Sequence, residues 1–324
     1  MSAARAFTAS AEIPGGAEIP ALMEEVERRM QTLAGEFGEL LARHARATVA
    51  AGGKRLRPLL VFLASGSVPG NEDRLVRAAV AVELVHSATL VHDDVLDGAA
   101  IRRGQPTVVA AGGPLMAAAT GDLLFSRAFA QLAAGGSPSA VRALSRASTG
   151  LAEGELLQRS DAWNADVPLE RYLERCRLKT AVLFRAACEL GALATDGPAQ
   201  LLGAFGEQIG LAFQLLDDVL DVSGPPERTG KPRGADLLDG TITLPLIRAR
   251  EADASLRTLD VRAIRTAEQA AQVCDRIEAS GALSEVRARA LEIVSVAKES
   301  LSSVAAAQRE ALEFVADGVV ARYA

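Results

Sequence analysis

Apolar residues recur every three or four positions along almost the whole chain, and this helical periodicity is the feature that most restricts its fold. Leu22, Val26, Met30, Leu33 and Phe37 show the pattern near the N-terminus. Alanine, the best helix former, makes up about a fifth of the 324 residues, while aromatic residues make up 4%. Because no segment alternates apolar and polar residues over the length of a strand, the sequence predicts an all-α protein.

Glycine and proline divide this pattern into successive helices. The first is predicted from about residue 22 to the pair Gly52–Gly53, and the second begins near Arg55. Residues 1–18 are predicted to be a flexible tail and residues 19–324 a single domain, because no internal stretch has the composition of a linker. Further helices are expected at about 75–96, 114–134, 137–162, 168–194 and 197–222, and again after a surface loop at 223–240.

Charge and cysteine content exclude several classes of protein. The formal net charge of −6 argues against a protein that binds the phosphate backbone of nucleic acids. Cys176, Cys188 and Cys274 are too scattered for a disulfide framework or a zinc site. The first twenty residues lack the apolar core of a signal peptide, and prolines and glycines interrupt the longest uncharged stretch. We therefore expect a cytoplasmic protein without a transmembrane segment.

The pentapeptide Asp-Asp-Val-Leu-Asp occurs twice, at Asp93–Asp97 and Asp217–Asp221. Each copy ends an apolar predicted helix, so its first and fifth aspartates share one helix face. Like charges at a helix C-terminus, where the macrodipole is already negative, repel one another unless a cation lies between them. Oxygen ligands alone suit Mg²⁺, with Mn²⁺ as a substitute. The alternative is a solvated acidic helix end, which two identical copies disfavour.

Basic residues accompany the two copies. Cations that bind anions, placed beside carboxylates that bind metals, describe a site for a polyphosphate. Each basic cluster alone is more typical of a solvated turn, so the prediction depends on their joint placement. The cations are Lys54, Arg55 and Arg57 in GGKRLRP, Arg102 and Arg103 after the first copy, Lys179 before Thr180, and Lys231 after the second copy.

Seven segments between about residues 50 and 250 resemble, in order, the signature motifs of the trans-isoprenyl diphosphate synthases, also called polyprenyl synthetases. They are GGKRLRPLL, ELVHSATLVHDDVLD, IRRGQPT, GELLQ, KTAVLF, FQLLDDVLD and GKPRGADLLDGTITLPLI. The likeness is strongest to bacterial medium- and long-chain synthases. It implies a helical bundle around a deep central cavity, usually in a homodimer. It also implies head-to-tail condensation of isopentenyl diphosphate with an allylic diphosphate, giving a product that can be handed to membrane enzymes.

The resemblance also implies residue roles. Two or three Mg²⁺ ions would be bound by Asp93, Asp97, Asp217 and Asp221, with Asp94 and Asp218 in supporting catalytic roles. The allylic diphosphate would be held by Arg102, Lys179 and Lys231, helped by Thr180 and Gln214. The diphosphate of isopentenyl diphosphate would be held by Lys54, Arg57, His86 and Arg103.

Product length is predicted from the helix that carries Asp93. In relatives that make short products, a bulky aromatic residue four or five positions before the motif closes the channel for the growing tail. Here these positions are Thr89 and Ala88, with Val85 a turn further along. Because these side chains are small or medium-sized, we expect a product longer than fifteen carbons, with thirty to fifty carbons favoured. A geranylgeranyl product of twenty carbons is the main alternative.

One departure from the family pattern lies in its last motif. The family often has a lysine after the glycine of this motif, and here Thr241 follows Gly240. We expect weaker binding of the allylic diphosphate rather than inactivity, since Lys231 and Arg233 remain nearby in sequence.

The sequence disfavours three other interpretations. A non-catalytic subunit of a heteromeric synthase would be expected to lose carboxylates, and all six aspartates are present. A terpene cyclase needs no second diphosphate site, so GGKRLRP with Arg103 disfavours it. A metal phosphohydrolase would need more histidine ligands than the chain's three histidines provide, and His44, in a polar stretch, is expected at the surface.

Overall fold

The computed structural model describes residues 17–36, 38–66, 68–225 and 232–321. It is 80% helical, which confirms the predicted all-α class. In the described ranges the strands are β1 (Ile101–Arg102) and β2 (Gln105–Pro106), which pair as a small antiparallel hairpin.

Contacts among the helices divide the chain into two compact units, which are described separately. The first consists of Met1–Ser148, Leu183–Gly206 and Leu301–Phe314, and the second of Thr149–Val182, Glu207–Ser300 and Val315–Ala324. Helices α7 (Pro138–Asp161), α10 (Ala199–Ser223) and α17 (Ala306–Ala321) contribute residues to both. The single domain from residue 19 stays a prediction, and residues 1–16 of the expected tail lie outside the described residues.

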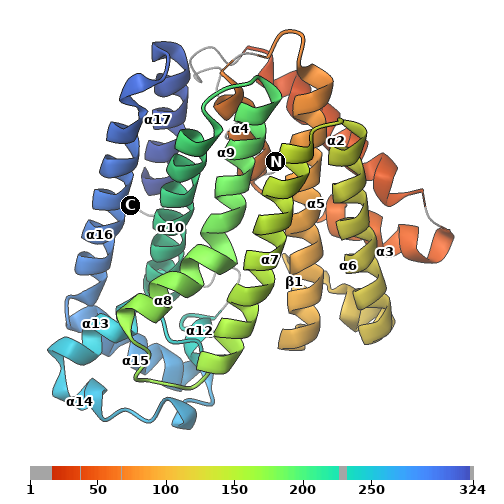
Figure 1. Cartoon of the computed structure of the whole chain (residues 1–324). Coiled ribbons are helices and arrows are strands. Elements are labelled where there is room, and N and C mark those ends of the chain that lie inside the picture. The colour runs from red at the N-terminus through yellow and green to blue at the C-terminus, as the bar shows by residue number, and fades with distance from the viewer. Residues whose placement is uncertain (1–16, 37, 67, 226–231, 322–324) are drawn as a thin grey trace. The chain divides into compact units, whose positions relative to one another are not determined.

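In the first unit, the helices pack around α5 (Glu72–Asp97). This helix contacts α2, α3 and α4 and lies alongside α6 over much of its length (Figure 1). Leu75, Val80 and Leu84 of α5 are completely buried, and Gly98, in the left-handed conformation, ends the helix at the predicted place. The other helices of this unit are α2 (Ile19–Ala34), α3 (Glu39–Ala50), α4 (Leu56–Ser65), α6 (Val108–Ala134) and most of α9 (Val182–Ala194).

The predicted N-terminal helix is wrong in one respect, because it is two helices. α2 ends at Ala34 and α3 begins at Glu39, with Gly38 between them at a φ of 46°. Glycine adopts this left-handed backbone without the steric cost that a Cβ adds, and its low helix propensity outweighs the apolar periodicity that continues through Leu40. α6 also starts earlier than predicted, at Val108, and is kinked at Gly113 just before Pro114.

In the second unit, the predicted helix at 168–194 is interrupted by a π-helical turn. α8 (Leu169–Cys176) leads into this turn, η1 (Arg177–Ala181), and α9 follows. The predicted surface loop at 223–240 contains one helical turn, α12. The remaining elements are α12 (Ala235–Leu238), α13 (Leu244–Ala252), α14 (Ala254–Arg257), η2 (Val261–Ala263), α15 (Ala267–Ala279), α16 (Ala282–Glu299) and η3 (Ser300–Ser303).

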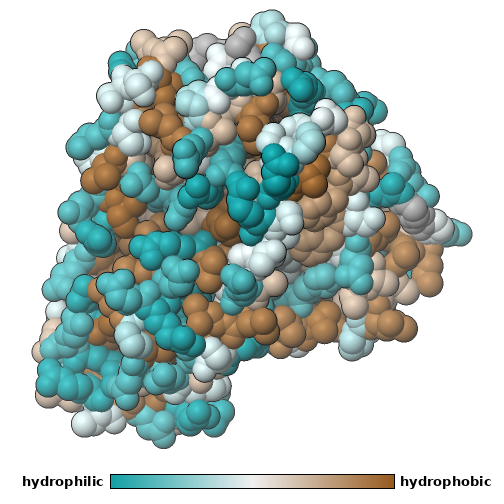
Figure 2. All heavy atoms as spheres, viewed as in Figure 1, coloured by the Kyte–Doolittle hydropathy of each residue, from teal (hydrophilic) through white to brown (hydrophobic). Residues whose placement is uncertain are grey.

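Two described helices, α5 and α6, are long and apolar enough to cross a membrane by length and composition alone. In α5, 72% of the most apolar 18-residue window is buried, which is typical of a core helix. In α6, only 28% of the corresponding window is buried. Leu115 of α6 is 85% exposed, and hydrophobic side chains gather on the side of the view where α3 and α6 lie (Figure 2). The absence of a transmembrane segment stays a prediction. The three cysteines are free and buried.

Candidate active site

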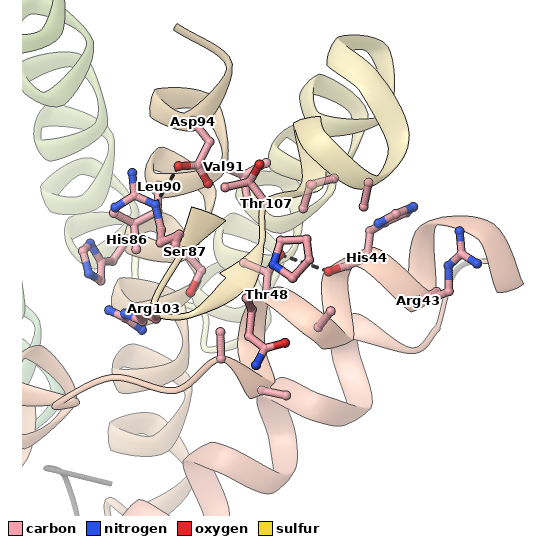
Figure 3. A pocket seen from close by; sticks show the side chains of 18 of the residues that line it. Arg43, His44, Thr48, His86, Ser87, Leu90, Val91, Asp94, Arg103 and Thr107 are labelled. Atoms are coloured by element: carbon pink, nitrogen blue, oxygen red, sulfur yellow. Dashed lines mark hydrogen bonds and ion pairs between the residues drawn. The ribbon is translucent and has the colours of Figure 1, made fainter. Parts of the chain in front are cut away.

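One face of α5 lines a cavity of about 740 Å³ that lies within the first unit. Its α5 residues, from Glu83 through His86 and Leu90 to Asp94, follow the three- and four-residue spacing of a helix face. The β1–β2 hairpin, α3 and the start of α6 form the other walls. His86 and Arg103 lie on one side of the pocket, and His44 and Arg43 lie on the other (Figure 3).

Arg55 anchors the loop that carries the GGKRLRP motif. It is buried, has a left-handed backbone, and lies directly before α4. Its guanidinium donates to Glu83 Oε1 at 2.7 Å and to the Val49 carbonyl at 2.9 Å, and it also pairs with Glu27. Burial alone would lower the pKa of Arg55, but the Glu83 and Glu27 carboxylates outweigh burial and raise it. Arg55 therefore positions the loop rather than serving as an available ligand.

Three of the residues expected to hold isopentenyl diphosphate form a basic cluster. Arg57 is half-buried, and its guanidinium lies 4.7 Å from the centre of the Phe184 ring. Burial lowers the pKa of Arg57 to about 10, with Glu83 opposing the shift. Burial and the neighbouring arginines also hold the pKa of His86 well below its usual range, so this imidazole is neutral at pH 7. The Arg57 Nε has no hydrogen-bond partner in the described structure.

Arg103 completes this cluster from the hairpin. Its backbone is left-handed, with a φ of 53°. A Cβ on Gly53 would lie 2.9 Å from the Arg103 Nη1, so the second glycine of GGKRLRP permits the guanidinium to approach the loop. Burial is the main cause that lowers the pKa of Arg103, and Arg55 and Arg102 add to it. Such a crowded group of cations is stabilised by an anion.

The aspartates of the first acidic motif differ in burial. Asp94 is buried and accepts from Arg102 Nε at 2.7 Å, so Arg102 is bound to the motif itself. Asp93 is half-buried and Asp97 is exposed. Because Asp93 and Asp97 are one helical turn apart, they remain the accessible pair of this copy.

The residues predicted to set product length lie in the first unit on α5. Val85 and Ala88 are completely buried, and Thr89 is half-buried and donates its hydroxyl to the His86 carbonyl at 2.9 Å. None of the three lines the 740 Å³ cavity. Their role stays a prediction.

Two histidines pack against α6. The surface position predicted for His44 is wrong, because the residue is only 6% exposed. It faces α6, where a Cβ on Gly112 would lie 3.1 Å from its Nε2. A polar sequence context did not reveal this long-range packing. His92 stacks on Phe125 with ring centroids 5.8 Å apart, an arrangement typical of packing rather than metal binding.

The second acidic motif lies in the second unit and is held by neutral donors. The Tyr172 hydroxyl donates to Asp218 Oδ2, and Gln214 Nε2 donates to Asp218 Oδ1 at 2.7 Å. Gln214 in turn accepts from the Thr180 hydroxyl at 2.7 Å. Burial, then Asp236, raises the pKa of Asp218 to about 8, with Asp217 contributing and the two hydrogen bonds opposing. Asp217 is exposed.

Lys179 lies in the π-helical turn and is paired with Glu155. Its Nζ is 2.5 Å from Glu155 Oε2, and the pKa of this carboxyl is lowered by Lys179 and Arg159 although burial opposes the shift. A Cβ on Gly154 would lie 2.6 Å from the Lys179 backbone nitrogen, so GELLQ needs its glycine for this approach. π-helical turns are frequent at functional sites.

The last motif is braced by contacts inside the second unit. Arg233 binds the Val222 carbonyl and pairs with Asp275 and Glu278, so it is already committed to neighbouring helices. Trp163 packs on Gly240, where a Cβ would lie 2.4 Å from the indole. Thr241 is half-buried beside this turn. Lys231 lies outside the described residues.

The acidic residues fit a divalent cation only together with an anionic substrate. In the described ranges, no group of three or more His, Cys, Asp or Glu side chains could hold a metal ion by itself. Mg²⁺ is typically bound through one or two carboxylates plus substrate phosphates. The mutual effect of Asp217, Asp218 and Asp236, which raises the pKa of Asp218, is of the kind that a bound cation relieves. The donor chemistry therefore fits such an ion.

Comparison with known proteins identifies the class to which this arrangement belongs. The profile of the polyprenyl synthetase family matches residues 38–279. The chain belongs to the polyprenyl synthetase family. It is 40% identical to heptaprenyl diphosphate synthase component 2 of Geobacillus stearothermophilus, over 83% of this chain and 86% of the relative. It is 37% identical to geranylgeranyl diphosphate synthase of Methanosarcina mazei, over 86% and 91% of the two chains.

A solved structure supports the same conclusion. A polyprenyl synthase from Caulobacter crescentus, complexed with calcium and isoprenyl diphosphate, superimposes with a TM-score of 0.89 at 36% identity. The match covers 95% of this chain and 97% of that one. The expected isoprenoid-synthase fold is thereby confirmed. The chain is a prenyltransferase, and its relatives bear names for products of different lengths.

Sequence reasoning missed four residues that support the site. Arg55 was counted among the cations but not recognised as a buried anchor. Glu83, Glu155 and Tyr172 were given no role, although Glu83 begins the segment ELVHSATLVHDDVLD and Glu155 lies in GELLQ. The presence of Glu83 and Glu155 in these segments was the available signal, but their partners Arg55 and Lys179 are 28 and 24 residues away in the sequence. Tyr172 lies in none of the segments.

Proposed function

We propose that the protein condenses isopentenyl diphosphate head-to-tail with an allylic diphosphate, in a reaction that depends on Mg²⁺. The observation that carries this proposal is the cluster of Arg57, His86 and Arg103, which combines two cations with a neutral imidazole. Such a group fits one diphosphate, separate from the carboxylates that suit metal ions. A second diphosphate site is what a condensing enzyme needs and a cyclase does not.

The outer aspartates of the two motifs would hold the metal ions. These are Asp93, Asp97, Asp217 and Asp221, with two or three Mg²⁺ as the proposed number. Bound there, Mg²⁺ would supply charge neutralisation for a departing diphosphate. Lys179 would orient the allylic diphosphate. Thr180 and Gln214, which form a hydrogen-bonded chain to Asp218, would help Lys179 to hold it.

The test is incubation of the purified protein with labelled isopentenyl diphosphate and each short allylic primer, with Mg²⁺ or with EDTA, followed by sizing of the product. We expect incorporation only with Mg²⁺, and a product longer than fifteen carbons, with thirty to fifty favoured over twenty. Ala88→Phe should shorten the product, because a buried ring fills space along α5. Absence of incorporation with every primer contradicts the proposal.

We propose a homodimer assembled through α6. Support comes from Leu115 and the largely uncovered apolar window of this helix, since contiguous apolar surface of this kind marks interaction sites. The name "component 2" of one relative favours a second candidate, a catalytic subunit that needs a different partner chain. Light scattering and activity of the protein purified alone separate the two. An active dimer supports the homodimer, and an inactive monomer supports the two-component enzyme.

A further inference from the structure

Trp163, in the connection between α7 and α8, has a left-handed backbone with a φ of 65°. A bulky residue adopts this conformation at a cost in free energy, so the surrounding contacts must enforce it. The Trp163 N–H donates to the Gly240 carbonyl at 2.8 Å, and the indole occupies the space that a Cβ on Gly240 would need. The Arg265 guanidinium lies 5.5 Å from the centre of the Trp163 ring. Trp163 is therefore held in its unusual conformation against the last motif.

Arg175 of α8 holds the same turn two residues further along the chain. It is buried, and its Nη2 donates to the Ile242 carbonyl. Its Nη1 has no hydrogen-bond partner in the described structure, so the guanidinium serves the backbone of the turn rather than a carboxylate. The turn 240–242 is thus fixed on both sides of Thr241, the position where the family often has a lysine.

Hydrogen bonds through α12 connect this turn to the second acidic motif. The Thr241 N–H donates to the Asp236 carbonyl at 2.8 Å, and the Asp236 N–H donates to Asp221 Oδ2 at 3.3 Å. The Gly234 N–H donates to the Asp221 carbonyl at 2.9 Å. After burial, Asp236 is the largest cause that raises the pKa of Asp218, so its carboxylate also lies close to the motif. The turn 240–242 therefore supports the side chain of the last aspartate in the second copy.

We propose that Trp163 is a positioning residue for the second metal site. It acts through the turn 240–242 and α12 to fix the orientation of the Asp221 carboxylate. The proposal rests on the proposed function, which assigns Asp221 to Mg²⁺. Residues that orient a metal ligand commonly change metal affinity by about 10- to 100-fold when they are replaced. Because the proposed isopentenyl diphosphate site lies in the first unit, its affinity should not depend on Trp163.

The test measures binding of Mn²⁺ to the whole protein in the presence of inorganic diphosphate, with the free ion detected by electron paramagnetic resonance. Trp163→Asn removes the indole but suits the left-handed backbone, which asparagine adopts more readily than most residues. It should raise the half-saturating Mn²⁺ concentration about 10-fold. Trp163→Phe is the matched control, because it keeps a flat ring against Gly240. Its half-saturating concentration should stay within about 3-fold of that of the unmodified protein, below the usual cost of a lost supporting group.

A double-mutant cycle tests whether Trp163 acts through Asp221. In the Asp221→Asn background, Trp163→Asn should weaken Mn²⁺ binding no further, because the carboxylate that it orients is absent. Arg265→Ala is a milder change at an exposed position, and it removes the cation beside the indole. It should weaken Mn²⁺ binding in the same direction, by about 2-fold. This variant keeps the test decisive if Trp163→Asn does not fold.

Turnover separates the failure of this proposal from the failure of the proposed function. With Mg²⁺, Trp163→Asn should raise the KM for the allylic diphosphate about 10-fold and leave the KM for isopentenyl diphosphate unchanged. Unchanged Mn²⁺ binding in both Trp163→Asn and Arg265→Ala overturns the proposal. An equal loss of Mn²⁺ affinity with and without the Asp221 carboxylate also overturns it, as does an equal rise in both KM values. Mn²⁺ binding that depends on Trp163 as described, in a protein that forms no product with any primer, contradicts the proposed function alone.

Discussion

The two copies of Asp-Asp-Val-Leu-Asp have the same sequence but opposite electrostatic surroundings. In the first copy, the buried Asp94 is paired with a cation, Arg102. In the second copy, the buried Asp218 is held by the neutral groups of Tyr172 and Gln214 and lies near Asp217 and Asp236, and its pKa is raised to about 8. The pentapeptide therefore defines the type of ligand, and the residues around it determine how strongly each copy requires an added cation.

The largest expected effect is a loss of activity when the first aspartate of either copy is removed, because both copies are proposed to bind metal ions through it. Asp93→Ala and Asp217→Ala should each lower kcat about 10²-fold or more, because each removes a group that stabilises charge in the transition state. The melting temperature in EDTA should stay the same or rise, since each change also removes like-charge repulsion. Steady-state kinetics and thermal unfolding measure the two effects. A large loss of stability in EDTA would make these aspartates structural instead.

The next prediction concerns the pH dependence of the second copy. In its metal-free state, Asp218 holds a proton up to about pH 8 when folded, but releases it near pH 4 when unfolded. The folded state therefore binds more protons between these values, and the free energy of unfolding should fall as the pH rises from about 4 to about 8. The slope is at most about 1.4 kcal/mol per pH unit for one proton.

Chemical unfolding in EDTA at a series of pH values measures this slope. Asp218→Asn should remove most of it, because the asparagine does not titrate and keeps hydrogen-bonding capacity toward Tyr172 and Gln214. The Asp94→Asn variant should retain the slope. Identical slopes for the unmodified protein and Asp218→Asn would show that Asp218 is already ionised.

A third prediction compares the cations of the first unit with the lysine of the second unit, because each set is proposed to bind a different substrate. Arg57→Ala and Lys54→Ala should raise the KM for isopentenyl diphosphate about 10- to 100-fold, the cost of a lost charged hydrogen bond, with a smaller effect on the allylic substrate. Lys179→Ala should raise the KM for the allylic substrate more than the KM for isopentenyl diphosphate. Arg28→Ala is the control, since Arg28 pairs with Glu25 on the surface. Equal losses for both substrates after Arg57→Ala would contradict separate diphosphate sites.

The sequence predicted the helical class, the helix end at Gly98 and the motifs, because each depends on local propensity or on short patterns. It did not predict which partner each motif residue has. Lys179 and Glu155 are 24 residues apart, and Tyr172 and Asp218 are 46 apart, so only the tertiary fold brings them together. The π-helical turn was missed for the same reason. Gly154 packs against the backbone of this turn, and nothing in the turn's own sequence marks it.

A fourth prediction tests the ion pair of the first copy. Asp94→Asn should lower the free energy of unfolding by about 1–2 kcal/mol, because it leaves Arg102 with a neutral partner. The effect is modest since the Arg102 side chain is 30% exposed and partly screened by water. Asp97→Asn, at an exposed position of the same motif, should leave stability unchanged. Equal stability of the Asp94→Asn variant and the unmodified protein would show that the pair contributes nothing measurable.

The smallest expected effect concerns the missing lysine of the last motif, in the unit that holds the second copy. Arg233 is occupied by Asp275, Glu278 and the Val222 carbonyl, so it does not replace that lysine. Thr241→Lys should therefore lower the KM for the allylic diphosphate up to about 5-fold. This factor corresponds to a gain in binding free energy on the order of 1 kcal/mol or less, because a partly exposed ammonium is screened by water. Thr241→Met is the control of similar length without charge. If both variants change the KM equally, side-chain bulk beside Trp163 and not charge is responsible. An unchanged KM in Thr241→Lys would mean that another cation already fills this position.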